Sequence, residues 1–293
     1  MTSALQAAWT ILRLTLREAV RRRMLLALFG LSTVAVLLTA WGYAELPNLR
    51  DGGSPRGISP DAQLRIVASQ LLIGVTFMFS FVLALFAVLA AAPAIAGARD
   101  SGELQAIAAR PVPRAAILVG KWAALAIVVV AYAAFSGTAE LAAVGLITGY
   151  VPPAPVAAIA FVAGEGLVVL SLTFLLGTWL SAVTSGVVAM LVFGIAWLGG
   201  VIGGIGAAFD DEVTSMVAPV IALIVPSDGL WRGAIYSLEH PDVLVAGTLA
   251  GPQASAFPFF AREPASMAFI AWCLVWVAAV LVGAVANFAR NDL

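Results

Sequence analysis

Apolar residues run along this chain in long uncharged stretches that short charged segments separate. A helix needs about 20 apolar residues to cross the roughly 30 Å hydrocarbon core of a bilayer. The stretch over residues 166–209 is too long for one span, and polar residues from Ser181 to Gly186 divide it into two. The pattern therefore predicts six transmembrane helices, over residues 24–43, 66–98, 122–150, 156–182, 186–209 and 265–288.

The same stretches favour helices over the strands of a transmembrane barrel. Such strands alternate apolar and polar residues over about ten positions, whereas these stretches are continuous runs of Ala, Val, Leu and Gly. The composition is 62% apolar and 11% charged, against roughly 25% charged in soluble proteins. We expect an all-α polytopic membrane protein.

Residues 1–23 carry an amphipathic pattern of their own. Leu5, Trp9 and Leu16 recur at helical spacing on one face, and Arg13 and Arg17 lie on another. This pattern predicts a helix in the membrane interface, with arginines at the headgroups. Continuation of the first span is the alternative interpretation. A cleaved signal peptide is disfavoured because both the basic and the apolar parts are too long.

The distribution of charge predicts the orientation. With the N-terminus inside, the cytoplasmic segments hold ten basic residues against four acids, and the outer segments hold five against ten. Basic residues accumulate on the cytoplasmic side of membrane proteins, so both termini are expected in the cytoplasm. The 14 arginines to one lysine suggest a GC-rich prokaryotic genome, hence the plasma (inner) membrane.

Two outer segments connect the spans. Residues 45–65 are rich in Gly and Pro and predict a turn-rich loop. Residues 210–264 contain an apolar patch, 213–225, that Pro219 interrupts. The patch is too short to span and predicts a re-entrant or interfacial segment.

The sequence gives little support for a metal site or for nucleophilic catalysis. Cys273 is the only cysteine and His240 the only histidine, so one chain offers no His/Cys zinc or copper site. An intramembrane hydrolase would need a nucleophile beside a base, and His240 lies in an outer segment without an evident partner.

The cytoplasmic segment 99–121 contains the most informative motif. Asp100 and Glu103 are typical of a capped helix start, and Pro111 ends that helix. Leu104 and Ile107 give the short helix an apolar face towards the cytoplasm. That face either binds a partner or lies back on the membrane.

These residues resemble the membrane subunits of type-2 ATP-binding-cassette exporters, the ABC-2 permeases. The similarity lies in the order of parts: Arg-Asp-Ser-Gly-Glu-Leu at 99–104, Ala-Arg-Pro-Val-Pro-Arg at 109–114, and Leu-Val-Gly-Lys at 118–121. The ending Phe288 to Leu293 is similar to the subgroup tied to multicopper-enzyme maturation. Ala98 departs from the acid usual before Arg99.

The resemblance implies that the short helix docks on a separate ATPase subunit. This chain has no Walker A loop, because its only lysine, Lys121, precedes Trp122. ATP and Mg would therefore bind to the partner, and this chain would be neither an enzyme nor a cofactor carrier. Two permeases, as a homodimer, with two ATPases are the usual arrangement. The residues implied in coupling are Arg99, Asp100, Gly102, Glu103, Leu104, Ile107, Arg110, Pro111 and Arg114.

Glu140 and Glu165 are acids inside the third and fourth spans. Each lies roughly ten residues from the outer loop between those spans, so both lie about 15 Å deep on neighbouring helices. Intramembrane acids usually face a bundle interior or a wet cavity. They either line the translocation path, where they could share a proton, or are structural. A proton-coupled secondary transporter that uses both acids is the alternative function.

Four glycines in the fifth span form Gly-x3-Gly pairs, which permit close approach of helices. They predict packing within the subunit or a dimer contact: Gly199, Gly200, Gly203 and Gly204. The substrate class stays open among lipids, drugs, peptides and sulfur compounds.

Overall fold

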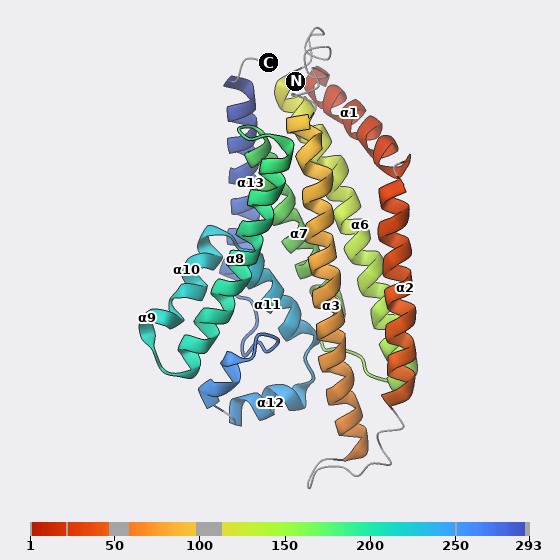
Figure 1. Ribbon diagram of the computed structural model, residues 1–293, viewed down its shortest axis with the longest axis vertical. Coiled ribbons are helices and arrows are strands. Elements are labelled where there is room, and N and C mark those ends of the chain that lie inside the picture. The colour runs from red at the N-terminus through yellow and green to blue at the C-terminus, as the bar shows by residue number, and fades with distance from the viewer. Residues whose placement is uncertain (1, 22, 47–58, 98–112, 250, 291–293) are drawn as a thin grey trace.

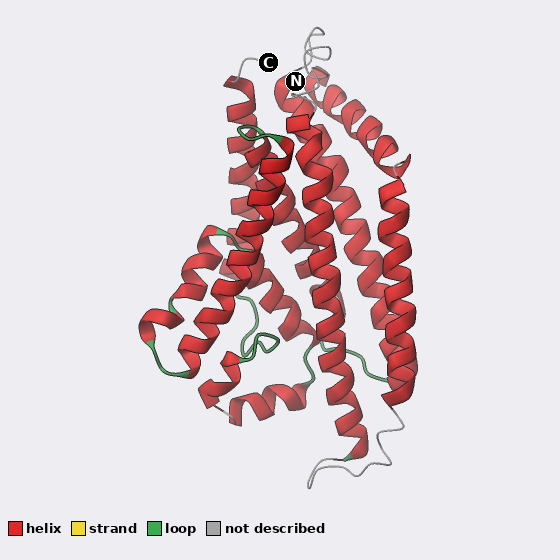
Figure 2. Ribbon diagram, viewed as in Figure 1, coloured by secondary structure: helices red, strands yellow, loops and turns green. Residues whose placement is uncertain are grey.

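A computed structural model of the chain describes residues 2–21, 23–46, 59–97, 113–249 and 251–290. Within these ranges the secondary structure is helical and includes no strand (Figure 2). Six helices are long and apolar enough to cross a membrane, so the all-α polytopic prediction is confirmed. They are α2 (Arg23–Glu45), α3 (Pro60–Ala92) with its π-helical continuation η2 (Pro93–Gly97), α6 (Arg114–Thr148), α7 (Pro155–Gly177), α8 (Ala182–Ala208) and α13 (Met267–Arg290).

Helices α3, α6 and α7 pack on one another at the centre of the bundle (Figure 1). Helix α2 covers α6, α8 packs on α7 and α3, and α13 packs on α7 and α6. The N and C marks lie at the same end of the bundle in Figure 1. An even number of spans requires this arrangement.

Helix α1 (Thr2–Arg21) is separate from the first span and inclined to it (Figure 1). It lies on α6, while Leu5 and Trp9 stay exposed. The Arg13 guanidinium lies 5.6 Å from the centroid of the Trp9 ring. An exposed Trp beside an Arg suits the boundary between acyl chains and headgroups.

Two spans begin earlier than the apolar pattern predicts. Helix α3 starts at Pro60 instead of residue 66, because the Ser59 hydroxyl accepts a hydrogen bond from the Ala62 amide and Pro60 occupies the first helical position. Helix α6 starts at Arg114 instead of residue 122, directly after the extended Pro113. The predicted loops 45–65 and 99–121 are therefore shorter than the sequence indicates.

The long apolar run 166–209 divides where its polar residues lie. Helix α7 ends at Gly177, and α8 begins at Ala182 with Ser181 as its N-cap. The Ser181 hydroxyl accepts a hydrogen bond from the Thr184 amide at 3.4 Å. A cap of this kind satisfies an amide that the helix itself cannot.

Residues 210–264 form a helical segment whose first part folds back into the bundle. It comprises α9 (Glu212–Ser215), α10 (Val217–Ile224), α11 (Ser227–Leu238), α12 (Pro241–Leu249) and η3 (Gly251–Ala256). The chain bends by 105° between Ile224 and Ser227. Because α9 and α10 together are only about 20 Å long, they cannot span, and they pack along α8 as a re-entrant hairpin with α11.

The inner end of this hairpin has hydrogen-bond partners on α13. The Trp272 Nε1 donates to the Leu223 carbonyl at 3.2 Å, and the Trp276 Nε1 donates to the Ile224 carbonyl at 2.8 Å. Carbonyls at a helix end lack partners within the helix and are costly in hydrocarbon. The two tryptophans therefore stabilise a helix end inside the membrane.

The topology is testable by cysteine labelling. A cysteine at Asp242, whose side chain is 57% exposed, should react with a membrane-impermeant maleimide in intact cells, and one at Thr184 should not. The native Cys273 is buried and should give a low background. Ser237, in the same outer segment, is buried and therefore unsuitable for labelling. Equal labelling of both variants would contradict the six-span topology.

Candidate functional site

The predicted coupling segment lies almost entirely outside the described residues. Arg99, Asp100, Gly102, Glu103, Leu104, Ile107, Arg110 and Pro111 fall within residues 98–112. The structure does describe Arg114 and the two helices that flank this segment. Those flanks show which helices the segment connects.

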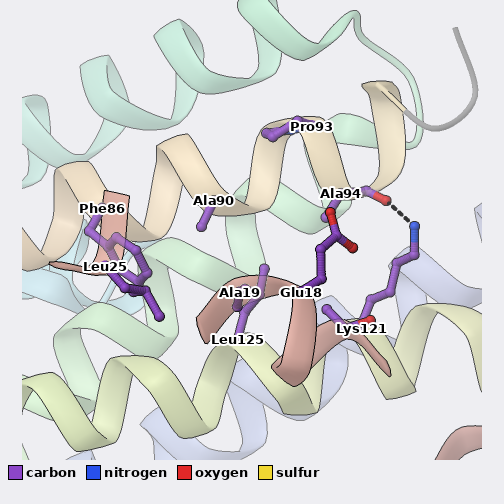
Figure 3. A pocket seen from close by; sticks show the side chains of 10 residues that line it. Glu18, Ala19, Leu25, Phe86, Ala90, Pro93, Ala94, Lys121 and Leu125 are labelled. Atoms are coloured by element: carbon purple, nitrogen blue, oxygen red, sulfur yellow. Dashed lines mark hydrogen bonds between the residues drawn. The ribbon is translucent and has the colours of Figure 1, made fainter. Parts of the chain in front are cut away.

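Two hydrogen bonds of α6 hold these flanks near the end that carries the termini. The Lys121 ammonium, on the second turn of α6, donates to the Ala94 carbonyl of η2 at 2.9 Å (Figure 3). The Arg114 Nη1 donates to the Ala289 carbonyl of α13 at 3.2 Å. The first of these bonds joins the two helices between which the coupling segment runs.

A proline produces the π-helical turn that presents the Ala94 carbonyl. Pro93 has no amide hydrogen, so it cannot continue the α-helical pattern of α3. The chain forms five residues of π-helix, Pro93–Gly97, before the coupling segment. Short π-helical segments interrupt helices frequently at functional positions.

Helix α1 approaches α6 closely at Gly120. A Cβ at this position would lie 2.7 Å from the Ala8 carbonyl oxygen and 3.0 Å from the Ile11 Cβ. Only glycine permits this contact without movement of α1. A cavity of about 90 Å³ lies beside it between α1, α3 and α6, and Figure 3 shows the Glu18 and Lys121 side chains at it. The three helices thus meet around the entry to the coupling segment.

Glu140 lies inside the bundle and faces α2. It is 1% exposed, and its Oε2 accepts a hydrogen bond from the Thr39 hydroxyl at 2.8 Å. The buried Tyr43 hydroxyl, also on α2, interacts with the same carboxyl. Two α2 side chains, Thr39 and Tyr43, therefore face Glu140 inside the bundle.

Glu165 lies on α7 and faces α3. It is 3% exposed, and the Ser80 hydroxyl donates to its Oε2 at 2.5 Å. Glu140 and Glu165 therefore have their hydrogen-bond partners on different helices. This arrangement does not favour a proton shared between them.

A third buried acid, which the sequence analysis placed in the outer segment, lies just after the bend of the hairpin. Asp228 is 5% exposed and accepts a hydrogen bond from the Arg232 Nε at 2.9 Å. The Arg232 Nη2 donates to the Gly200 carbonyl at 2.5 Å. Asp228 also interacts electrostatically with Glu165. The acid and base four residues apart on one helix are a sequence signal that could have identified this pair.

The glycines of α8 pack against the re-entrant hairpin of the same chain. A Cβ at Gly200 would lie 1.9 Å from the Asp228 Oδ2, and one at Gly203 would lie 2.4 Å from the Ala218 Cβ. At Gly199 it would lie 2.1 Å from the Ile221 Cδ1. These positions hold glycine because the hairpin occupies the space of their side chains. Gly204 lines a groove beside them.

A further polar group lies at the end of the bundle opposite the termini. The Tyr150 hydroxyl donates to the Leu238 carbonyl at 2.6 Å, next to Glu239, which is fully buried. Burial raises the pKa of the Glu239 carboxyl to about 8. Burial, and then the nearby Glu239 charge, raise the pKa of the Tyr150 hydroxyl. These groups fix the loop between α6 and α7 on α11.

The described residues contain no group of three or more His, Cys, Asp or Glu side chains that could hold a metal ion. The buried carboxyls of the spans and hairpin instead accept hydrogen bonds from hydroxyls or, in Asp228, from an arginine.

Comparison with protein families places nearly the whole chain in a described family. The family described as ABC-2 family transporter protein matches residues 9–293. The match includes α6, α7, α8 and the predicted coupling segment 98–112. No curated protein matches the chain.

Proposed function

Because this chain belongs to the ABC-2 family of transporter proteins, we propose that it forms the membrane-spanning path of an ATP-driven exporter whose ATPase is a separate subunit. The family match over residues 9–293 is the observation that carries the proposal. The hydrogen bonds of Lys121 and Arg114 support it, since the first joins the two flanks of segment 98–112 to each other and the second joins α6 to α13.

In this proposal the coupling segment receives the movement of the ATPase, and α3 and α6 transmit it into the bundle. The Lys121 contact with Ala94 makes the two flanks move together. The contact of α1 at Gly120 extends the same movement to the interfacial helix. ATP and Mg bind to the ATPase, and two copies of this chain with two ATPases form the complete transporter in the plasma membrane. The family comparison does not support assignment to the subgroup of multicopper-enzyme maturation.

The experiment that tests the proposal is reconstitution with candidate ABC ATPases from the same genome, beginning with any encoded next to the gene of this chain. The purified chain and ATPase should form a stable complex in detergent, and ATP hydrolysis by the ATPase should change when the chain is present in liposomes. Expression of the chain alone should give no ATP hydrolysis. An ATPase that neither binds the chain nor responds to it would contradict the proposal.

The buried acids are proposed to line the translocation path. The double change Glu140→Gln with Glu165→Gln keeps the size of both side chains and can keep the hydroxyl contacts to Thr39 and Ser80. We therefore expect the free energy of unfolding to change by no more than about 1 kcal/mol. ATP turnover linked to transport should fall strongly.

The matched control is Glu212→Gln, which removes an exposed acid near the outer end. It should leave both stability and turnover near wild type. Unchanged turnover in the double variant would return Glu140 and Glu165 to a structural role. Substrate transport that follows an imposed proton gradient in the absence of ATP would instead favour the secondary transporter.

A further inference from the structure

A groove of about 310 Å³ opens where α8, the re-entrant hairpin and the segment before α13 meet. Small residues of α8 and of the hairpin form its floor, among them Gly204, Ala207 and Ser215. Its charged wall consists of Arg232, Arg262 and Glu263. It is a polar recess next to a surface that faces the bilayer.

Arg232 is held rigidly at this wall. Its Nε is bound to Asp228 and its Nη2 to the Gly200 carbonyl, which fix the plane of the guanidinium. The side chain is nevertheless 27% exposed. A planar guanidinium fixed in this way is suited to bind phosphate.

The groove lies at the depth of lipid headgroups. Gly203 and Ala207 belong to the last turns of α8, which ends at Ala208. The hairpin residues that line the groove lie just after the outer turn at Asp211. The exposed Phe257 is close in sequence to the lining residue Phe260, and aromatic rings accumulate at this level.

Apolar surface continues from the groove along both of the elements that form it. Ile202 and Ile205 of α8 and Val220 and Ile224 of α10 are exposed. In a membrane, such surfaces contact acyl chains. The combination of a cationic recess with flanking apolar surface suits a ligand with a phosphate head and hydrocarbon tails.

We propose that this groove binds the headgroup of a phospholipid, with the phosphate between Arg232 and Arg262. Glu263 adds one carboxylate at the same wall, so a headgroup that ends in an ammonium complements the site better than a purely anionic one. The site is independent of the proposed coupling to an ATPase, and a lipid bound there stabilises the contact between α8 and the hairpin.

The test uses the full chain in delipidated detergent micelles, titrated with dioleoyl phosphatidylethanolamine and observed by native mass spectrometry. One lipid should bind with saturation. Arg262→Gln removes an exposed guanidinium that would donate hydrogen bonds to the phosphate, and it should weaken lipid binding about ten-fold. Arg65→Gln is the matched control, because it removes an arginine at the same end of the bundle that lines a different cavity. Glu263→Gln should shift the preference towards dioleoyl phosphatidylglycerol.

Three results would overturn the lipid site, and a fourth would overturn its preference for an ammonium headgroup. The groove is not the site if Arg262→Gln binds the lipid with the same affinity as Arg65→Gln. The same conclusion follows if lipid binding to the wild-type chain does not saturate. Displacement of the lipid by equimolar inorganic phosphate or glycerophosphoethanolamine would assign the groove to a soluble phosphate compound instead. If Glu263→Gln has the headgroup preference of the wild type, Glu263 does not bind the ammonium of the headgroup.

Discussion

A chain with Arg232→Ala should lose about 3–5 kcal/mol of its free energy of unfolding, the usual result of removing one partner from a buried ion pair. The change leaves Asp228 buried at 5% exposure without its cation and leaves the Gly200 carbonyl without its donor. Asp228 and Gly200 are both buried, so water in the groove beside Arg232 can replace the guanidinium only in part. The measurement is an unfolding titration in mixed detergent and SDS micelles, followed by tryptophan fluorescence.

The double variant Arg232→Ala with Asp228→Ala shows whether the loss comes from the stranded charge. It removes both charges and should be more stable than Arg232→Ala alone. Arg262→Ala provides the control for loss of an arginine at an exposed position and should change stability by no more than about 0.5 kcal/mol. If Arg232→Ala matched Arg262→Ala, the pair would have no structural importance.

The variant Leu104→Ala with Ile107→Ala should lose the ATPase partner. If the short helix after Asp100 docks on that subunit, the two side chains are its buried anchors, and each contributes roughly 1–3 kcal/mol to binding. The dissociation constant should then rise roughly 30-fold or more. Both positions lie between α3 and α6, outside the spans, so membrane insertion should be normal.

Copurification and ATP turnover of the complex measure this effect. Gln105→Ala, on another face of the same predicted helix, is the matched control and should retain the partner. Arg110→Ala should have a smaller effect, because exposed charge contacts contribute about 1 kcal/mol or less. Retention of the partner and of full turnover by the double variant would mean that the docking assignment is wrong.

The spans could be predicted from sequence because one physical requirement determines them. A segment in lipid must be apolar and long, and both properties are visible in the residues themselves. The predicted ends of the spans were less accurate than their number. Apolarity marks where a helix lies in hydrocarbon, whereas Ser59 and Pro113 mark where the helix begins, several residues outside it.

The candidate site was only partly visible, because its members come from distant parts of the chain. Glu140 and Glu165 stand out as acids in apolar runs, but Thr39 and Ser80 are ordinary until folding brings them to the carboxyls. Asp228 was counted with the outer acids because the hairpin that buries it contains no run long enough to span. Its burial depends on packing against α8, which no local pattern encodes.

The tryptophan contacts of α13 have a consequence for biosynthesis. The α10 carbonyls of Leu223 and Ile224 obtain their donors from Trp272 and Trp276, which follow 49 and 52 residues later in the chain. During synthesis the first five spans can enter the bilayer before those donors exist, and a hairpin inserted at that stage would expose unpaired carbonyls to lipid, at several kcal/mol each. The hairpin is therefore expected to complete its insertion only when the last span leaves the ribosome and joins the bundle, so that the outer half of the protein matures after translation of residues 267–290.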